Sequence, residues 1–295
     1  MIEILRSTHQ FLIFRQNLPE CTVGFVPTMG NLHTGHLSLV RESLENNDWT
    51  ILSIFVNPKQ FGPNEDFERY PRTLGRDVSL VRDLFREGGF EEKGKKIAFF
   101  CPEKVSEVYP PDYNTTITVG DELTGRLCGK SRPGHFDGVT TVVFQLFSLV
   151  KPNKAYFGQK DYQQYLVIKR MISDLNLNIQ IVPMPIKRDK DGLALSSRNQ
   201  FLTHEQKKEA LILPKILERI KTTIKENNWL TAQPIIKEII SDYKNSHSWD
   251  YLKVLDSTDL KEPHEESHTV VIAGALKVGE TRLIDNKLVE LNYVR

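Results

Sequence analysis

The first two-thirds of the chain alternates between short apolar segments and longer amphipathic ones. The short segments are rich in β-branched and aromatic residues and are bounded by turn formers, which is typical of strands. They are Thr22–Thr28, Thr50–Asn57, Lys96–Pro102, Asn114–Gly120, Lys154–Lys160 and Asn178–Ile186. Between them, apolar residues recur at helical spacing, as in the sets Val78, Val81, Leu84, Phe85 and Val139, Val142, Val143, Leu146, Phe147, Val150. The repeated strand–helix–strand order predicts an α/β fold, a parallel sheet with helices on both faces.

The pattern changes near residue 185. Two helical segments, Thr203–Asn227 (interrupted by Pro214) and Ala232–Tyr243, precede three strand-like stretches, "YLKVLD", "HTVVIAGALKVG" and "TRLIDNKLVEL". This order predicts a smaller α+β domain. A chain of 295 residues is long for one core. We therefore expect two domains, residues 1–184 and 185–295, with the charged loop "KRDKDGLALSSRN" at the join.

Composition and charge narrow the class of protein. The hydrophobic fraction of 39% and the charged fraction of 26% are those of an ordinary globular protein. The net charge of +1 gives no global field for a polyanion, so we expect no nucleic-acid partner. Three cysteines without CxxC spacing indicate reduced thiols. With no recognisable leader and no apolar run of membrane-spanning length, the sequence predicts a cytoplasmic protein without a membrane partner.

The most informative motif is "VPTMGNLHTGH", Val26 to His36. It follows an apolar strand and precedes an amphipathic helix, so His36 falls at the helix N-terminus and His33 just before it. A helix N-terminus favours phosphate, and two imidazoles there can donate hydrogen bonds to phosphate oxygens. Gly30 and Gly35 allow a ligand to approach the backbone. The stretch therefore predicts a phosphate-binding site, although either histidine alone would fit an ordinary turn.

A zinc site is the competing interpretation of this histidine pair. Two histidines three residues apart could ligate a metal, but no further Cys or His lies at a suitable spacing nearby. His135 and His204 are isolated in the sequence. A structural zinc is therefore disfavoured.

Other polar loops fall at the same predicted edge of the sheet, where ligands of such folds bind. "YFGQKDYQQ" offers Lys160 for a phosphate, and its glutamines suit a carboxylate or hydroxyl. "LSSRN" combines two hydroxyls with an Arg. Asn57 and Gln60 follow the second strand, and Arg132 would suit a carboxylate. Each of these stretches taken alone also fits a solvated polar loop.

Seven blocks together give a more specific result. "FVPTMGNLHTGH", "SIFVNPKQF", "YPRTLGRD", "SRPGHFDGV", "FGQKDYQQ", "DGLALSSRN" and "RLIDNKLVEL" occur in the order found in the pantothenate synthetase family, which this chain resembles from about residue 22 to its C-terminus. HxGH alone would indicate only the wider nucleotidyltransferase superfamily. The resemblance implies a Rossmann-like catalytic domain, a C-terminal lid domain, and an ATP-dependent condensation of pantoate with β-alanine through a pantoyl adenylate, yielding pantothenate, AMP and diphosphate for coenzyme A biosynthesis.

The resemblance also implies roles for particular residues. His36 would be the proton donor, and His33 and Lys160 would be catalytic through phosphate contacts. The ATP site would comprise Met29, Gly30, Asn31, Leu32, His33, Thr34, Gly35, His36, Gly158, Gln159, Lys160, Asp161, Lys187, Leu195, Ser196, Ser197 and Arg198. Gln60 and Gln164 would bind pantoate, Gln60 would also bind β-alanine, and Asp77 would lie in the environment of Mg²⁺. The family is typically homodimeric.

Three positions depart from the family pattern without removing an implied contact. Lys59 replaces a common Met in "NPKQF", "GQKD" replaces the usual "GEKD", and Lys187 stands where an apolar residue is common.

Two other functions compete with the ligase. One is another nucleotidyltransferase, including a tRNA-charging enzyme, which the near-neutral charge disfavours. The other is a protein that binds ATP without turnover, which the presence of the whole phosphate-contacting set disfavours.

Overall fold

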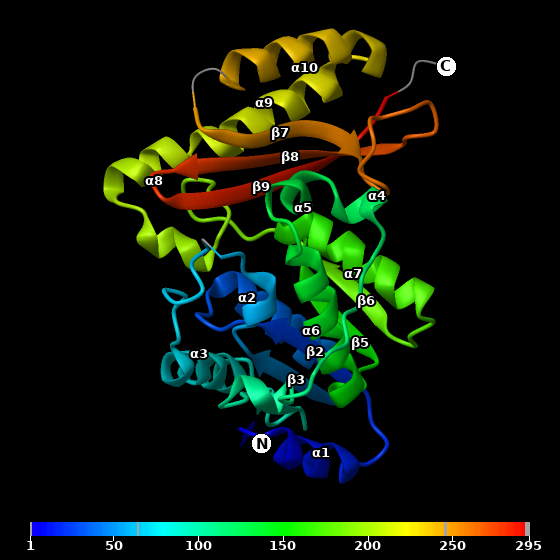
Figure 1. Cartoon of the computed structure of the whole chain (residues 1–295). Helices are drawn as coiled ribbons and strands as arrows, with labels where there is room; N and C mark the ends of the chain where they lie inside the picture. The colour runs from blue at the N-terminus through cyan, green and yellow to red at the C-terminus, as the bar shows by residue number, and fades with distance from the viewer. Residues whose placement is uncertain (1, 64, 245–246, 293–295) are drawn as a thin grey trace. The chain divides into compact units, whose positions relative to one another are not determined.

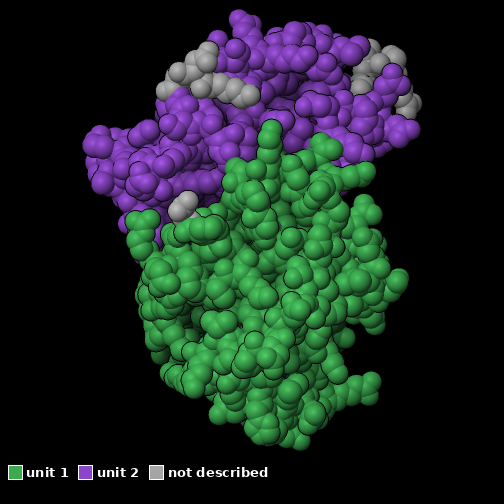
Figure 2. Space-filling view, in the orientation of Figure 1, with its two compact units in different colours: residues 1–159, 163–185 green, residues 160–162, 186–295 purple. Residues whose placement is uncertain are grey.

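The computed structural model describes residues 2–63, 65–244 and 247–292 (Figure 1). The chain forms two compact units, coloured separately in Figure 2. The first comprises Met1–Gln159 and Gln163–Pro185, and the second comprises Lys160–Tyr162 and Ile186–Arg295. The short segment Lys160–Tyr162 therefore belongs to the second unit although it follows a strand of the first.

The first unit contains a six-stranded sheet in the order β1-β4-β3-β2-β5-β6, and every neighbouring pair in it is parallel. The strands are β1 (Ile2–Leu5), β2 (Val23–Thr28), β3 (Trp49–Ile54), β4 (Lys96–Phe100), β5 (Lys154–Gly158) and β6 (Gln180–Met184). The helices are α1 (Thr8–Gln16), α2 (Thr34–Asn46), α3 (Leu74–Glu87), α4 (Asp121–Thr124), α5 (Leu127–Ser131), α6 (His135–Val150) and α7 (Tyr162–Asp174). The parallel α/β architecture predicted from the sequence is confirmed.

Alternate residues of β2 show that both faces of this sheet are covered. Val26 joins a buried cluster with Leu39 and Leu44 of α2. Its neighbour Phe25 points to the opposite face, because successive strand side chains alternate, and its ring packs 6.2 Å from that of Phe147 in α6. The central strands are thus buried on both sides, which explains why they are apolar without alternation.

One predicted strand is wrong. Residues 114–120 form no strand, and the backbone of Ile117 bonds to side chains of α6 instead. The Ile117 N–H donates to Oγ1 of Thr141 at 3.0 Å, and the Ile117 carbonyl accepts from the Thr140 hydroxyl. Period-2 patterning marks an extended chain but does not identify its hydrogen-bond partner. Conversely, β1 and α1 were not predicted from the N-terminal pattern.

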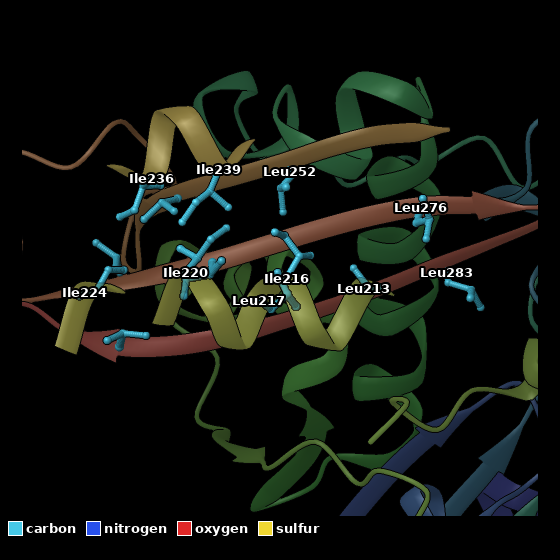
Figure 3. Close-up of a cluster of buried hydrophobic side chains, with 14 of the residues drawn as sticks. Leu213, Ile216, Leu217, Ile220, Ile224, Ile236, Ile239, Leu252, Leu276 and Leu283 are labelled. Carbon is cyan, nitrogen blue, oxygen red and sulfur yellow. The ribbon is translucent and has the colours of Figure 1, made fainter. Parts of the chain in front are cut away.

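The second unit packs helices against a three-stranded antiparallel sheet in the order β7-β8-β9. Its elements are α8 (His204–Ala210), α9 (Ile212–Glu226), α10 (Trp229–Lys244), β7 (Trp249–Asp256), β8 (Thr269–Val278) and β9 (Thr281–Glu290). Leucines and isoleucines of α9 and α10 meet the sheet in one apolar core (Figure 3). Pro214 lies in the first turn of α9, where its missing N–H breaks no helical bond.

Candidate active site

The loop between β2 and α2 makes a tight turn that only a few residue types accept. Gly30 has φ of +85° and Asn31 has φ of +50°, both in the left-handed region. A Cβ on Gly30 would lie 3.0 Å from Ile54 Cγ2 and 3.1 Å from Oδ2 of Asp77. The glycine expected from the motif is therefore required by conformation and by space.

Asp77 of α3 fastens this loop through its backbone. Its Oδ2 accepts the N–H of Asn31 at 2.9 Å and its Oδ1 accepts the N–H of Leu32 at 2.8 Å, while the Thr73 hydroxyl donates to both oxygens at 3.2 Å. The Asp77 side chain is fully buried. Both carboxylate oxygens are thus occupied by protein donors, which does not fit the magnesium environment implied by the resemblance, since a hard cation needs open oxygen ligands.

His33 and His36 open helix α2 together. His33 is the N-cap residue, and its Nδ1 accepts the N–H of Gly35 at 3.1 Å. Nδ1 of His36 in turn faces the His33 N–H at 3.4 Å, and the two ring centroids are 4.0 Å apart. Because a neutral imidazole that accepts at Nδ1 carries its proton on Nε2, both rings are set up to donate from Nε2 at a helix N-terminus.

Gln60 lies beside this loop on the short 3-10 turn Pro58–Gln60 that follows β3. Its Nε2 is 3.1 Å from Sδ of Met29, the first residue of the predicted ATP loop. Asn57 donates to Oε1 of Gln60 at 3.1 Å and to the Gly138 carbonyl at 3.0 Å. The structure therefore brings the predicted pantoate residue and the predicted ATP loop together within one unit.

A second set of contacts holds the backbone of Gln60. Its carbonyl lies 2.8 Å from Nδ1 of His135 and accepts from Arg132 at 3.2 Å. Arg132 also makes a two-point ion pair with Glu65, at 2.6 Å and 2.5 Å. Burial raises the pKa of Glu65, but the hydrogen bond and the charge of Arg132 outweigh it and hold this pKa below its ordinary value.

The next predicted segment follows β5. Gly158 ends the strand, Gln159 comes directly after it, and Gln164 is half-buried on the first turn of α7. Its neighbour Gln163 is buried: its Oε1 accepts the N–H of Cys128 at 2.9 Å, and its Nε2 donates to two backbone carbonyls. Of these two neighbouring glutamines, Gln163 is thus committed to the scaffold.

The remaining predicted residues belong to the second unit. Lys160 and Asp161 lie on a 3-10 turn, and the Lys160 carbonyl accepts from the Asn286 amide of β9 at 3.0 Å. Lys187 is exposed, and its carbonyl accepts the N–H of Leu195 at 2.9 Å. Ser196 caps the 3-10 helix Ser197–Phe201 by accepting the Arg198 N–H at 3.2 Å.

Several residues of this framework were not predicted from the sequence. The scaffold roles of Asn57, Asp77 and Tyr109 depend on partners distant in the chain; the Tyr109 hydroxyl, for example, donates to Oδ1 of Asn57 at 2.9 Å across 52 positions. The sequence pattern does not distinguish Glu65 or Asn286 as functional residues, although both lie in or near recognisable blocks.

Among the described residues, no group of three His, Cys, Asp or Glu side chains could hold a metal ion. No helix in the described ranges is long and apolar enough to cross a membrane.

Comparison with known proteins identifies the family. The family model for pantoate-beta-alanine ligase matches residues 3–288. A pantothenate synthetase of Acetivibrio thermocellus is 47% identical over 293 residues, covering 99% of each chain. The crystal structure of the pantoate-beta-alanine ligase of Thermus thermophilus superposes with a TM-score of 0.86 at 39% identity, covering 97% of this chain and 99% of that one. The Francisella tularensis ligase, solved with beta-gamma ATP and beta-alanine, gives 0.76 at 33% identity over 98% of both chains.

A parallel sheet with a tight glycine loop and paired histidines at a helix N-terminus defines a Rossmann-like nucleotide-binding enzyme. The chain belongs to the pantoate–β-alanine ligase family. It is an ATP-dependent ligase that condenses pantoate with β-alanine.

Proposed function

We propose that the ligase reaction runs through a pantoyl adenylate, with the β2–α2 loop as its phosphate site. A carboxylate oxygen of pantoate attacks the α-phosphorus of ATP, and diphosphate leaves with the electrons of the broken P–O bond. The amine of β-alanine then attacks the acyl carbon, AMP leaves, and the nitrogen loses a proton. Two imidazoles that donate from Nε2 at a helix N-terminus suit the first step, because they stabilise charge that grows on phosphate oxygens. This pair is the observation that carries the proposal.

The ATP site in this proposal comprises Met29–His36, Gly158–Asp161, Lys187 and Leu195–Arg198. His36 and His33 contact the phosphates, and Lys160 adds a point charge there. The segment Ser196–Arg198 supplies two hydroxyls and a guanidinium as further donors to the phosphates. Lys187 contributes through its backbone, and its side chain is exposed. In this scheme His36 acts as a hydrogen-bond donor from Nε2 to the phosphate oxygens.

The acid and amine substrates are assigned to two glutamines. We assign Gln60 and Gln164 to pantoate, and Gln60 also to β-alanine. The position of Gln60 supports this, since its amide lies against Met29 while Asn57 holds its oxygen. A neutral amide can donate to a carboxylate and accept from a hydroxyl, which are the groups that pantoate offers.

Magnesium enters this scheme with the nucleotide. Mg²⁺ is commonly held by substrate phosphates with one or two carboxylates, and it retains several waters. The oxygens of Asp77 already accept backbone N–H groups, so we assign that residue to the loop and no step of the reaction to the metal.

We further propose a homodimer, as is typical of the family. We also propose a cytoplasmic location, which the three cysteines without disulfides support.

Diphosphate release tests the proposal directly. The purified protein is supplied with ATP, magnesium and pantoate, with and without β-alanine, and AMP and pantothenate are quantified. We expect release to be stimulated by β-alanine, with AMP and pantothenate formed in equal amounts. Release with other acids but not with pantoate would retain the adenylation and remove the substrate assignment. Absence of release with any acid would favour binding without turnover.

A variant of the histidine pair tests the mechanism separately. His36→Ala is expected to lower kcat by on the order of a hundredfold while the protein still unfolds cooperatively, since one stabilising donor contributes about that much. His204→Ala, at the exposed start of α8, serves as the control. An unchanged kcat for His36→Ala would remove the phosphate role of this loop.

A further inference from the structure

Two segments that we assign to the ATP phosphates are fastened to the same strand of the second unit. The Lys160 carbonyl accepts a 3.0 Å hydrogen bond from the buried amide of Asn286 on β9. The other end of this short segment is held by Tyr162, whose hydroxyl donates to the Ser257 carbonyl at 2.8 Å. These two bonds explain why Lys160–Tyr162 belongs to the second unit.

The neighbouring residue on β9 holds the second segment. The side chain of Asp285 is fully buried, and both of its oxygens are bound by Arg188, at 2.6 Å and 2.9 Å. Arg188 also donates to the Gly192 carbonyl at 3.0 Å. Because the guanidinium is committed to this buried carboxylate, Arg188 serves as an anchor, and Arg198 remains the arginine assigned to phosphate.

Arg188 begins a small hairpin that ends at the serine pair. Arg188 and Ala194 form an antiparallel bridge, and Leu193 on the returning arm is buried in the core of the second unit. Asn199 lies in the 3-10 helix Ser197–Phe201, and its side-chain amide donates to the Ala194 carbonyl at 3.0 Å. The position of Arg188 therefore determines where the segment Ser196–Arg198 lies after the hairpin.

We propose that Asp285 and Asn286 are positioning residues that hold Lys160 and the Ser196–Arg198 segment as one set for ATP. The two residues are adjacent on β9, and the Asn286 N–H donates to the Asp285 carboxylate at 2.7 Å, so the two anchors are coupled. Neither residue needs to touch the nucleotide. Small displacements of binding groups weaken the contacts that they make with a bound ligand, which gives such anchors a function beyond stability. The inference rests on the proposed phosphate roles of Lys160 and Ser196–Arg198.

The test compares Asn286→Ala and Asp285→Asn with a matched control on the same strand. Arg282→Ala is the control, because Arg282 also pairs with a carboxylate, donating from Nε and Nη2 to Oδ2 of Asp250 on β7, and the hydrogen bonds described for it go to neither segment. We expect both test variants to raise KM for ATP by about tenfold or more and to change KM for pantoate less than about twofold. Equal changes in both KM values, or a loss of kcat alone, would overturn the proposal. Titration with a non-hydrolysable ATP analogue checks the affinity independently of turnover.

A double-mutant cycle with Lys160→Ala separates this inference from the function on which it rests. If Asn286 acts through Lys160, Asn286→Ala adds little to KM for ATP once Lys160→Ala is present. Full additivity of the two changes overturns the positioning role while leaving the phosphate role intact. A Lys160→Ala variant with unchanged affinity for ATP overturns the phosphate role itself. Should Asp285→Asn fail to fold, Asn286→Ala decides the question alone, because it leaves the ion pair of Asp285 in place.

Discussion

The amide nitrogen of Asn57 lies 3.1 Å from Oε1 of Gln60, and this bond determines which end of the Gln60 amide is left for a ligand. Asn57 is itself fixed, because it is buried, accepts from the Tyr109 hydroxyl at 2.9 Å and donates to the Gly138 carbonyl at 3.0 Å. We therefore expect Asn57→Ala to raise KM for pantoate and for β-alanine by about tenfold, the equivalent of one lost hydrogen bond of about 1.4 kcal/mol.

Steady-state kinetics with each substrate varied in turn provides the measurement for Asn57→Ala. KM for ATP should change much less than KM for pantoate, because the hydrogen bonds of Asn57 go to the Gln60 turn, Tyr109 and Gly138. Asn46→Ala is the control, since Asn46 is exposed on α2 and its side chain donates to Glu42 of the same helix. A parallel rise in all three KM values would contradict a specific role in orienting Gln60.

Gly138 explains why helix α6 can approach the Gln60 turn so closely. A Cβ built at this position would lie 2.6 Å from the Gln60 nitrogen and closer still to the Lys59 carbonyl, and backbone atoms cannot rotate away. Gly138→Ala should therefore displace the turn, weaken pantoate binding and lower the free energy of unfolding by about 1–3 kcal/mol. Urea unfolding and the KM for pantoate measure the two effects.

Gly120→Ala is the matched control for Gly138→Ala. Gly120 is exposed, has a negative φ, and a Cβ there would meet nothing within 4 Å. Its variant should unfold at the same urea concentration as the wild type. If Gly138→Ala matches it in stability and in KM, the close approach of α6 is not what positions Gln60.

The sequence predicted the parts of the site that depend on local chain geometry. Gly30 and His36 were placed correctly in a strand–loop–helix unit, because the loop conformation and the helix N-terminus are set by neighbouring residues. The scaffold around Gln60 could not be predicted in the same way. Tyr109 reaches Asn57 across 52 positions, and only the packing of the sheet brings them together.

The segment predicted as a strand at residues 114–120 shows the same limit. Its apolar and threonine-rich pattern predicted a strand, but the backbone of Ile117 bonds to Thr140 and Thr141 of α6 rather than to a neighbouring strand. Gln163 and Gln164 make the point within one helix turn. Both offer the same amide, and only burial shows that Gln163 is used to hold Cys128 and the carbonyls near it.

Asp77→Asn distinguishes a loop anchor from a metal ligand. The variant presents an amide NH₂ where a carboxylate oxygen now accepts a backbone N–H, so one of the bonds to Asn31 and Leu32 is replaced by a clash of donors. We expect the free energy of unfolding to fall by about 1.5–3 kcal/mol, the range for hydrogen bonds to a charged group, and kcat to fall because the histidine loop shifts.

Magnesium titration completes the test of Asp77. If the carboxylate only anchors the loop, the magnesium concentration that gives half-maximal activity is the same for Asp77→Asn and the wild type. Recovery of the variant's activity at higher magnesium would instead assign the carboxylate to the metal. Asp83→Asn is the control, since Asp83 lies on the same helix and forms an exposed ion pair with Arg86.

The ion pair between Glu65 and Arg132 should make stability depend on pH in a defined direction. Burial raises the pKa of Glu65, whereas the hydrogen bond and the charge of Arg132 lower it. The lowering effect is larger, so the folded-state pKa lies below the ordinary value of 4.5. A group with a depressed folded pKa stabilises the protein fully above its unfolded pKa. That contribution is lost as the pH falls from about 4.5 through the folded value, because the folded state must then take up a proton that the unfolded state already holds.

Glu65→Gln should therefore lower the free energy of unfolding at neutral pH and reduce its decline below about pH 4.5. Urea unfolding from about pH 7 to about pH 3 measures both quantities, with Glu205→Gln as the control because Glu205 pairs with Lys208 on an exposed surface. The same ion pair holds Arg132 against the Gln60 carbonyl, so KM for pantoate should rise in Glu65→Gln and stay unchanged in the control. A pH dependence of stability identical to the wild type would mean that Glu65 contributes no linked protonation, whereas a stability effect without a change in KM would separate the ion pair from the substrate site.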